Sequence, residues 1–551
     1  MRRNLSKALP SLVRTLATPS QPHSQALAAL PLKYTTLKNG VQVATDPTPG
    51  HFVAAGVYVD AGSRYEGDRT RGAGHMTDRL GFKSTSNRTA EQMTKEIESL
   101  GGQFHSSSSR ESMMYQATTY TRDTDTAISI LSDTVLHALI TPSELDAQRD
   151  SAAWEVRELN NKPDMILPER LHEIAYKGNT LGNPLLCPED RLESMTTDTI
   201  EEFRRLWYRP DRIVVAGAGI EHEHLVELAE RHFGDMKAPF LTTPTLRSNA
   251  NSNSPTKPSI SKFLSTSASS SATPAATTPS TDPNSFEFLS TAKAKYTGGE
   301  LYIPDKDVEF THFHFAWEGL SITDPDIYTL ATLQMLLGGG GSFSAGSFPL
   351  FLRFPPRYDS FLTSLLPHLA GGPGKGMYSH LYTKVLNQYH AVDHCVAFHH
   401  CYVDSGLFGI QIVVNHDFVS QAPSLIATIA NSLTHPTRNG ISTGELERAK
   451  NQLKSNLAMQ LESRIIQVED LGRQTQVLGH KVTLEETAAK VDAVTMSDLY
   501  RVASRVFRPW TSNLVSDRAK SGLPSIVVQG DVDRLPDIGA TLRRWDLAGK
   551  Q

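Results

Sequence analysis

The sequence predicts an α+β protein made of two similar halves joined by a long linker. Its 551 residues exceed what one ordinary hydrophobic core accommodates, so two or more domains are expected. In both halves, short apolar runs rich in β-branched residues alternate with long stretches of helical periodicity. The segment 213–217, IVVAG, also resembles the segment 526–530, IVVQG, and acidic residues follow both closely. These two segments suggest that one structural plan occurs twice.

The first half, residues 32–240, begins with the strand–strand–helix pattern of an α+β unit. Apolar and β-branched residues predict strands at 41–45 and 52–60. Thr89 opens a helix with Gln92 at capping-box spacing, and this helix ends at Leu100 before two glycines. Helical periodicity then extends from about 123 to 207, with breaks near Pro142, Pro163 and Pro184, before a strand at 213–216 and a helix at 222–233.

The second half, residues 296–545, repeats this order. We expect a strand at 310–317, a helix at 324–337, strands near 395–402 and 406–414, long helices from 417 to 507, and a final strand at 526–528. Between the halves, residues 241–295 are rich in Ser, Thr, Pro, Ala and Asn. Such a segment cannot bury enough apolar surface to order itself, so we expect a linker with a disordered insert.

Composition excludes several classes of function. A hydrophobic share of 39%, a charged share of 21% and a net charge of −5 describe a globular protein without the basic excess of nucleic-acid binders. No run of about 18 apolar residues occurs, so no membrane span is expected. The three cysteines, Cys187, Cys395 and Cys401, have no framework spacing and predict no disulfide.

The N-terminus has the composition of a mitochondrial targeting segment. Six basic residues precede the first acidic residue, Asp46: Arg2, Arg3, Lys7, Arg14, Lys33 and Lys38. Residues 2–17 mix leucines with serine and basic residues, the pattern of a cationic amphipathic transit peptide, and they lack the apolar core of a secretory signal. We therefore expect removal of about residues 1–16. The alternative is a disordered basic tail.

The strongest local motif is His75-Met76-Thr77-Asp78-Arg79, which follows a glycine-rich turn. It resembles the inverted zinc motif of the pitrilysin-like metallopeptidases, in which two histidines of one helix bind zinc and a glutamate activates the metal-bound water. A second glutamate, about 76 residues further on, is the third ligand in that family. By position, His75 matches the first histidine, Asp78 the catalytic glutamate, Arg79 the second histidine, and Glu155 the distal ligand. The resemblance implies two homologous pitrilysin-like α/β-roll halves.

Two of these four positions have changed, and the change at Arg79 is chemically decisive. A guanidinium has no lone pair to offer a metal and stays charged. His75 and Glu155 alone leave two protein ligands where a catalytic zinc has three, and Asp78 is one methylene shorter than a glutamate. We expect no bound zinc and no catalytic residue on this chain. Arg79 is expected to pair with Asp78 or with Glu155.

A second motif is a glycine-rich loop in the second half. It comprises Gly338, Gly339, Gly340, Gly341, Ser342, Phe343 and Gly346, and continues with Gly372, Gly374, Lys375 and Gly376. A phosphate-binding P-loop is excluded because Gly376 stands where a Ser or Thr must follow the lysine. Joined across the gap, the two parts resemble the substrate-binding loop of non-catalytic members of the pitrilysin-like family. The alternative is a surface loop without substrate contact.

The resemblance implies a function in partnership. In that family, an inactive α-type subunit forms a heterodimer with a zinc-bearing β-type subunit in the mitochondrial matrix, and the glycine loop captures presequence peptides of imported proteins for cleavage by the partner. The implied partners are therefore the β subunit and presequences, with no cofactor on this chain. The alternative is a core structural subunit of the respiratory cytochrome bc complex. A third candidate, an independently active metallopeptidase, would need zinc ligands that the sequence lacks.

The sequence departs from the family pattern at two further places. Residues 347–371, rich in Phe, Leu and Pro, interrupt the glycine loop, and we expect an unspliced intron or a mis-assembled exon there rather than a functional lid. His380 stands where the family has an arginine, which argues against a strong charge contact. A metal site at His394, Cys395, His399, His400 and Cys401 is disfavoured, because alternate residues of a strand point to opposite faces.

Overall fold

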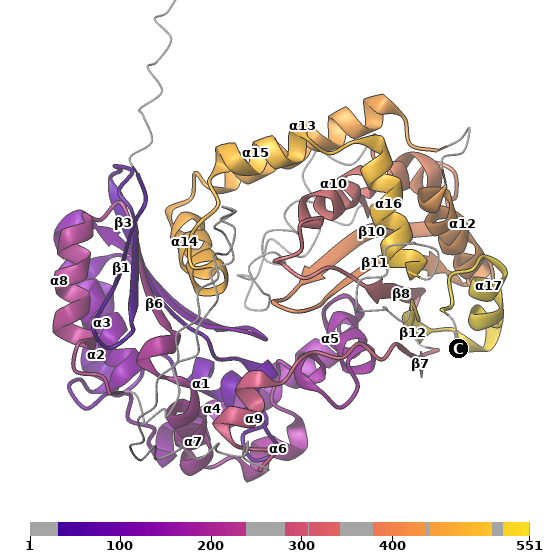
Figure 1. The fold of residues 1–551 in the computed structure, drawn as a ribbon. Coiled ribbons are helices and arrows are strands. Elements are labelled where there is room, and N and C mark those ends of the chain that lie inside the picture. The colour runs from indigo at the N-terminus through magenta and orange to yellow at the C-terminus, as the bar shows by residue number, and fades with distance from the viewer. Residues whose placement is uncertain are drawn as a thin grey trace, which may run out of the picture.

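The computed structural model describes residues 31–237, 282–306, 308–341, 378–435, 440–509 and 522–549. Within these ranges the chain forms two lobes, each a six-stranded sheet with helices (Figure 1). The predicted transit peptide 1–16, most of the predicted linker 241–295 and the anomalous segment 347–371 lie outside the described residues.

The N-terminal sheet has the strand order β1-β2-β6-β3-β5-β4. Its strands follow the predicted β-branched runs, with β1 and the β4–β5 pair in addition to those predicted. Their bounds are β1 Lys33–Thr36, β2 Gln42–Asp46, β3 Phe52–Val59, β4 Gln103–Ser108, β5 Met113–Tyr120 and β6 Ile213–Ala218. Only the β2–β6 pair is parallel in this sheet.

The C-terminal sheet has the order β7-β12-β8-β11-β10-β9 and repeats the first one. The sequence β7-β12-β8-β11-β10 has the same pattern of one parallel and three antiparallel pairs as β2-β6-β3-β5-β4. The predicted match between 213–217 and 526–530 is therefore confirmed, since β6 and β12 are equivalent strands. The bounds are β7 Gly299–Pro304, β8 Phe310–Glu318, β9 Gly339–Gly341, β10 Val392–Cys401, β11 Gly406–Asn415 and β12 Ser525–Gly530.

Most breaks in the predicted helical periodicity become helix starts. Thr141 caps α4 by accepting the Glu144 N–H, and Pro142 occupies its first turn, where no intrahelical N–H is needed. The N-terminal helices are α1 Ala73–Arg79, α2 Ala90–Leu100, α3 Thr124–Leu136, α4 Pro142–Asn160, α5 Pro163–Ala175, α6 Glu189–Ser194, α7 Thr197–Trp207 and α8 His222–Phe233. The described helices from residue 282 onward are α9 Phe286–Thr291, α10 Ile327–Leu337, α12 Ala422–Thr434, α13 Thr443–Gln460, α14 Arg464–Leu478, α15 Leu484–Asp492, α16 Met496–Phe507 and α17 Ile538–Arg544.

Part of the predicted linker forms a helix. Within 241–295, residues 286–291 form helix α9, and Phe286 packs against Trp207 with a ring-centroid distance of 5.2 Å. The guanidinium of Arg209 lies over the Phe286 ring, 4.0 Å from its centroid. Phe286 and the buried Leu289 pack on the N-terminal core, so two apolar side chains of a short helix supply an anchor that composition alone conceals.

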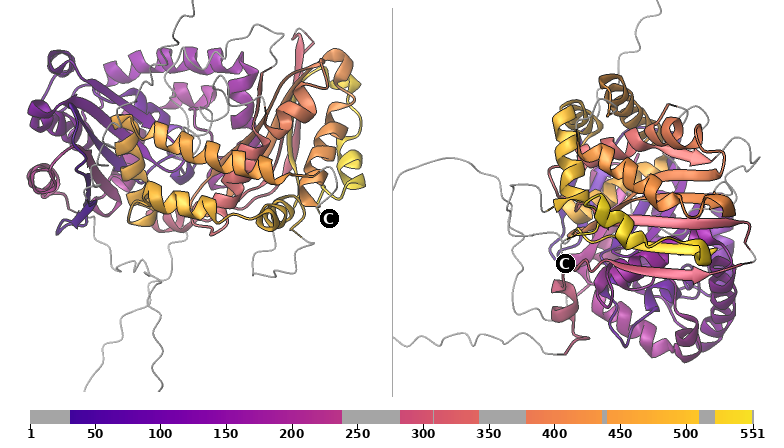
Figure 2. Two further views of the ribbon diagram at one scale, coloured as in Figure 1. Left: turned by 90° about the horizontal axis from the view of Figure 1, so that it is seen from above. Right: turned by 90° about the vertical axis from the view of Figure 1, so that its right-hand side faces the viewer.

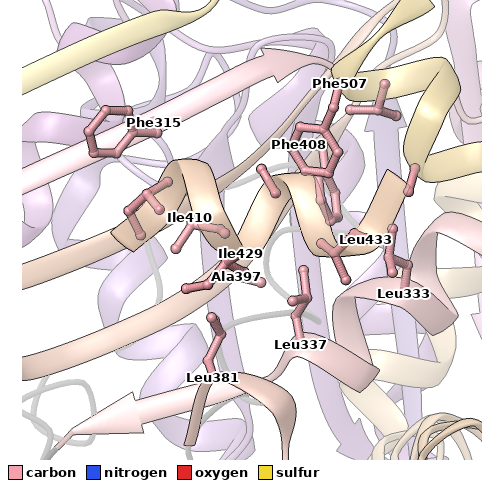
Figure 3. Packing of buried hydrophobic residues seen from close by; sticks show 14 of the residues in the cluster. Phe315, Leu333, Leu337, Leu381, Ala397, Phe408, Ile410, Ile429, Leu433 and Phe507 are labelled. Atoms are coloured by element: carbon pink, nitrogen blue, oxygen red, sulfur yellow. The ribbon is translucent and has the colours of Figure 1, made fainter. Parts of the chain in front are cut away.

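The C-terminal core lies between its sheet and the helices on the outer face. Phe315 of β8, Phe408 and Ile410 of β11, and Phe507 of α16 point toward one another with Leu333 and Leu337 of α10 (Figure 3). All six side chains are fully buried. This packing fixes α10, which leads directly into the glycine loop.

Each half covers one face of the other half's sheet with a helix. Helix α14 of the C-terminal half packs on β2, β3 and β6, whereas α5 of the N-terminal half packs on β7, β8 and β12 (Figure 1). The two helices hold equivalent places in the repeat, so the exchange is reciprocal. Seen from above, the orange helices, which include α14, extend from the C-terminal lobe to the N-terminal lobe (Figure 2).

The exchange depends on a close approach between Tyr58 and Gly472. Tyr58 of β3 is fully buried, and its hydroxyl accepts a hydrogen bond of 2.8 Å from Gln116. Gly472 of α14 lies against this ring, and a Cβ at that position would overlap it. Glycine is therefore required where α14 crosses the N-terminal sheet.

A buried ion cluster also joins the halves. Arg64 Nη1 lies 2.7 Å from both Glu111 Oε1 and Asp404 Oδ1, and Nη2 donates to Asp404 Oδ2 at 2.5 Å. The carboxylate of Glu111 also accepts the Val403 N–H, and Asp404 accepts the Ala294 N–H. Arg64 thus ties the N-terminal half to β10–β11 and to the segment after α9. Removing a partner from such a buried cluster costs about 3–5 kcal/mol.

No helix in the described part of the chain is long and apolar enough to cross a membrane. The three cysteines are buried and unpaired. Cys395 and Cys401 face the C-terminal core.

Candidate degenerate zinc site and glycine loop

Helix α1 carries the zinc-like motif and packs against α4, α7 and β4. Its N-cap residue is Gly72, which adopts a left-handed conformation at φ 82°. The carboxylate of Glu66 accepts the N–H groups of Gly72 and Gly74 at 2.7 Å each, so a buried acid caps the helix. Burial raises the pKa of Glu66 to about 7, although the two backbone hydrogen bonds oppose that shift. No sequence pattern predicts this capping role of Glu66.

His75 lies next to Glu155, as the motif implies, but its imidazole has a tautomer that is unsuited to binding a metal. Its Nδ1 accepts a hydrogen bond of 3.2 Å from the Cys187 N–H. A neutral imidazole that accepts at Nδ1 carries its proton on Nε2. That Nε2 lies 3.6 Å from Glu155 Oε2, so a proton occupies the position from which a ligand would donate its lone pair.

Arg79 fills the place that the second histidine would take. Its Nη1 lies 3.0 Å from Glu155 Oε2, and its Nη2 donates to Ser151 Oγ. Of the two pairings that the sequence leaves open, the structure has the one with Glu155. The side chains of Arg79 and Glu155 are 16% and 12% exposed, so the pair is largely shielded from solvent. A cation thereby neutralises the distal acid that zinc would otherwise use.

Asp78 points away from His75 and Glu155. Its Oδ2 accepts the backbone N–H of Ser108 in β4 at 3.2 Å, and the Ser106 hydroxyl donates to the Asp78 carbonyl at 3.0 Å. Asp78 therefore fastens α1 to the edge strand β4 instead of aiming at the site. This is a structural role for the position that corresponds to the catalytic glutamate.

The residues present do not fit a zinc ion. His75 and Glu155 are two potential ligands, the His75 tautomer directs a proton inward, and Arg79 brings a positive charge to the same space. In the described ranges, no group of three His, Cys, Asp or Glu side chains is arranged to hold a metal. No step of peptide hydrolysis can be derived through this site.

The glycine loop starts at the edge of the C-terminal sheet. Gly339–Gly341 form β9, which pairs with His394, Cys395 and Val396 of β10. Gly338 adopts φ 55° and ψ −126°, a conformation that favours glycine. The rest of the predicted loop, Ser342, Phe343, Gly346, Gly372, Gly374, Lys375 and Gly376, lies outside the described residues.

The two described ends of the loop meet. A Cβ on Gly338 would lie 2.5 Å from Ser379 Cβ, so the chain leaves and re-enters at one place. Beyond Ser379, a π-helix at Tyr382–Leu386 also packs against β9. The chain therefore resumes at its point of departure, as expected if the two glycine-rich parts belong to one loop.

His380 anchors this re-entry point to α13. Its Nδ1 lies 3.5 Å from Glu445 Oε1, and the side chain is 4% exposed. Burial lowers the pKa of His380, and Glu445 opposes that shift. Next to it, Tyr378 is 69% exposed, with the Arg448 guanidinium 6.0 Å from its ring centroid.

The histidine–cysteine set of β10 divides between the two faces of the sheet, as predicted. His400 faces α5, where its ring lies 5.0 Å from that of His172, whereas Cys395 and Cys401 face the core. His172 is hydrogen-bonded on both ring nitrogens, to the Pro168 carbonyl and to the Tyr402 hydroxyl at 2.7 Å each. These histidines belong to the contact between the halves.

Comparisons with known proteins agree with this architecture. Residues 42–189 match the family described as Insulinase (Peptidase family M16), and residues 194–453 match the Peptidase M16 inactive domain. A protease from Helicobacter pylori has a similar fold, with a TM-score of 0.68 over 91% of this chain and 99% of that chain, at 19% identity. That likeness concerns the fold alone.

Several relatives are similar over most of their length. The chain is 46% identical to the mitochondrial-processing peptidase subunit alpha of Neurospora crassa, over 90% of this chain and 86% of that protein. It is 40% identical to a probable α subunit from Schizosaccharomyces pombe, over 92% and 88%, and 30% identical to the human α subunit, over 92% and 83%. These relatives do not favour a core subunit of the cytochrome bc complex. The chain therefore belongs to the mitochondrial-processing peptidase α-subunit family, within peptidase family M16.

Proposed function

We propose that this chain is the non-catalytic α subunit of a processing peptidase in the mitochondrial matrix, where it recognises and positions presequences for a zinc-bearing β subunit. The observation that carries the proposal is the contact between Arg79 and Glu155. A guanidinium stands where hydrolysis would need a metal ligand, and Asp78 is turned toward β4.

The need for a partner follows from this chemistry. Zinc hydrolases activate a metal-bound water and orient it with a carboxylate, and this chain presents neither function at α1. Cleavage must then come from another chain. The relatives are named as subunits, which supports a complex with a β-type partner as the working unit.

Substrate recognition is assigned to the glycine loop, from Gly338 to Gly346 and from Gly372 to Gly376. Glycines without a Cβ let an extended peptide approach the backbone closely and adapt to varied sequences. The position of Gly338 at a sheet edge, packed against Ser379, gives this loop a rigid base.

The decisive experiment is presequence cleavage by each chain alone and by the mixture, with zinc quantified on each purified chain. We expect cleavage only in the mixture, with about one zinc on the β-type chain and none on this one. Cleavage by this chain alone, abolished by His75→Ala, would contradict the proposal. A soluble heterodimer is expected, and recovery only in a membrane complex with a haem protein would instead support a respiratory role.

Targeting has its own test. Residues 1–16 are proposed to be removed on import, so N-terminal sequencing of the mitochondrial protein should begin near residue 17. A native protein that begins at Met1 would contradict the transit peptide without affecting the proposed role in the complex.

A further inference from the structure

Trp154 is an exposed tryptophan on a well-packed helix. The indole of Trp154 in α4 is 67% exposed, whereas Trp207 and Trp317 are fully buried. The buried positions of α4 include Leu145, Ala152 and Val156, so Trp154 lies on the opposite side of the helix. Most of its large apolar surface takes no part in the packing of α4 and is available to another molecule.

Trp154 stands at the rim of the degenerate zinc site. Ser151 precedes it by one helical turn and accepts a hydrogen bond from Arg79, and the next residue, Glu155, pairs with the same guanidinium. Because the charge of Arg79 is directed at Glu155, the site beneath Trp154 does not present a free cation to an approaching ligand.

The charges of α4 are mostly used within the protein, with one exception. The helix carries five acidic and two basic residues in the segment PSELDAQRDSAAWEVRELN. Arg149 pairs with Asp146, Arg157 with Glu189, and Glu158 with Lys162. Asp150 has no ion pair within 4.0 Å among the described residues, and it is exposed. Residues four apart share a helix face, so Asp150 and Trp154 lie on the same exposed face of α4.

We propose that Trp154 and Asp150 form a contact site for cationic amphipathic peptides, on α4 and separate from the glycine loop. An arginine or lysine can stack on the indole and pair with the Asp150 carboxylate, while a neighbouring leucine covers the rest of the ring. Residues 2–17 of this chain have that composition, with Arg2, Arg3, Lys7 and Arg14 among leucines. The site deepens the proposed function, on which it rests for the class of substrate.

Binding can be measured on the full chain without residues 1–16, with a fluorescent synthetic peptide of the sequence 2–17 as probe. By anisotropy, Trp154→Ala should weaken binding about tenfold and Trp154→Phe by less, because a phenyl ring keeps part of the stacking surface. Asp150→Asn should weaken binding about threefold and reduce its dependence on salt. A peptide with its four basic residues replaced by glutamine should bind weakly to every variant.

Tyr302→Ala provides a matched control. Tyr302 in β7 is 39% exposed and donates a hydrogen bond to Glu300, so it is also an exposed aromatic side chain beside a carboxylate, but in the other half. Its loss should leave peptide affinity unchanged. Equal affinities of Trp154→Ala and the unmodified chain would overturn the inference, as would an equal loss for Tyr302→Ala.

Cleavage by the mixture with a β-type partner separates this inference from the proposed function. If the mixture cleaves presequences and Trp154→Ala leaves KM unchanged, the contact site is wrong and the function stands. If the mixture does not cleave while binding still depends on Trp154, the function is wrong and the contact site stands. We expect Trp154→Ala to raise KM with little change in kcat.

Discussion

Arg79 Nη1 lies 3.0 Å from Glu155 Oε2, the same oxygen that His75 Nε2 approaches at 3.6 Å, so a guanidinium stands where a metal ion would need a third ligand. A substitution at position 79 would change the chemistry of this pair. An imidazole at position 79 would lie one helical turn from His75 and would present a lone pair in place of a positive charge.

The double substitution Asp78→Glu and Arg79→His should therefore confer zinc binding. His75, Glu155 and the introduced imidazole would supply three ligands, provided that the His75 ring gives up its hydrogen bond from Cys187. Zinc retained after dialysis, measured by mass spectrometry, is the readout. Arg79→Ala is the control: it should bind no zinc and should lower the free energy of unfolding by about 1–3 kcal/mol, because Glu155 loses the Arg79 guanidinium. A double variant without zinc would show that the surrounding scaffold has changed as well.

Gly338→Ala should impair substrate processing more than it impairs folding. The Cβ would meet Ser379 at 2.5 Å in a backbone conformation with φ 55°, so the base of the glycine loop must shift. Presequence cleavage by the complex should fall several-fold. Gly101→Ala is the control for a methyl group at positive φ without a steric clash, since Gly101 has φ 60° and ψ 16° and nothing lies within 4 Å of an added Cβ. Equal losses for the two variants would contradict a special role for the loop base.

Gly472→Ala should weaken the union of the halves. The added methyl overlaps the Tyr58 ring, and overpacking of this kind costs about 1–3 kcal/mol of unfolding free energy. Gly444→Ala is the matched control, because Gly444 is also helical and its nearest neighbour to an added Cβ is the end of the Arg448 side chain at 3.9 Å. Chemical denaturation should show a lower midpoint for Gly472→Ala and an unchanged or higher one for Gly444→Ala.

Acid should loosen the contact between α5 and the C-terminal sheet. Burial lowers the pKa of His314 and of His400 to about 3, below the unfolded value of about 6.5. A lowered folded pKa means that the stabilisation is complete above about pH 6.5 and is lost as the pH falls toward 3. Neighbouring groups include Asp164, Glu169 and His172 of α5, His312 of β8, His394 of β10 and Arg110 of the β4–β5 turn.

The measurement is the urea midpoint between pH 7.5 and pH 5, with His400→Phe as the comparison. The variant should show a shallower loss of stability with acid, since it removes one group that must be neutral in the folded state. Glu66 acts in the opposite direction: its pKa is raised to about 7, so its contribution is present at low pH and lost as the pH rises through 7. Glu66 is common to both proteins and cancels in the comparison. Parallel pH profiles would contradict the role of His400.

Periodicity predicted the strands and helices whose sequence pattern is strong. Helices α2, α4 and α5 carry capping residues or an early proline, and β6 and β12 are apolar throughout, so their places could be inferred. Strand β4 was missed because its sequence, QFHSSS, has little apolar content and lies at a sheet edge. Strand β7, GELYIP, was missed as well. It ends in a proline, which an edge strand tolerates.

The site was predictable in its members but not in its geometry. Motif spacing placed His75 and Arg79 together, because helix positions four apart share one face. Glu155 was added to them by the resemblance to the pitrilysin-like family. Motif spacing could not reveal that the Cys187 N–H sets the tautomer of His75, or that Asp78 turns to Ser108, since both contacts depend on how distant segments pack. The exposure of Trp154 was likewise invisible, because tryptophan in an amphipathic pattern usually marks a core position.

Helices α5 and α14 each pack on the sheet of the other half. A chain that enters a compartment N-terminus first therefore cannot complete the packing of either sheet early. The β3–β6 face stays uncovered until α14 arrives, and the hydrogen bond from Gln467 to Asp46 spans 421 residues. Helix α5 must in turn wait for β12, close to the C-terminus. A newly delivered chain therefore holds apolar sheet surface exposed until almost its whole length has entered, which makes it a client for chaperones that shield such surfaces.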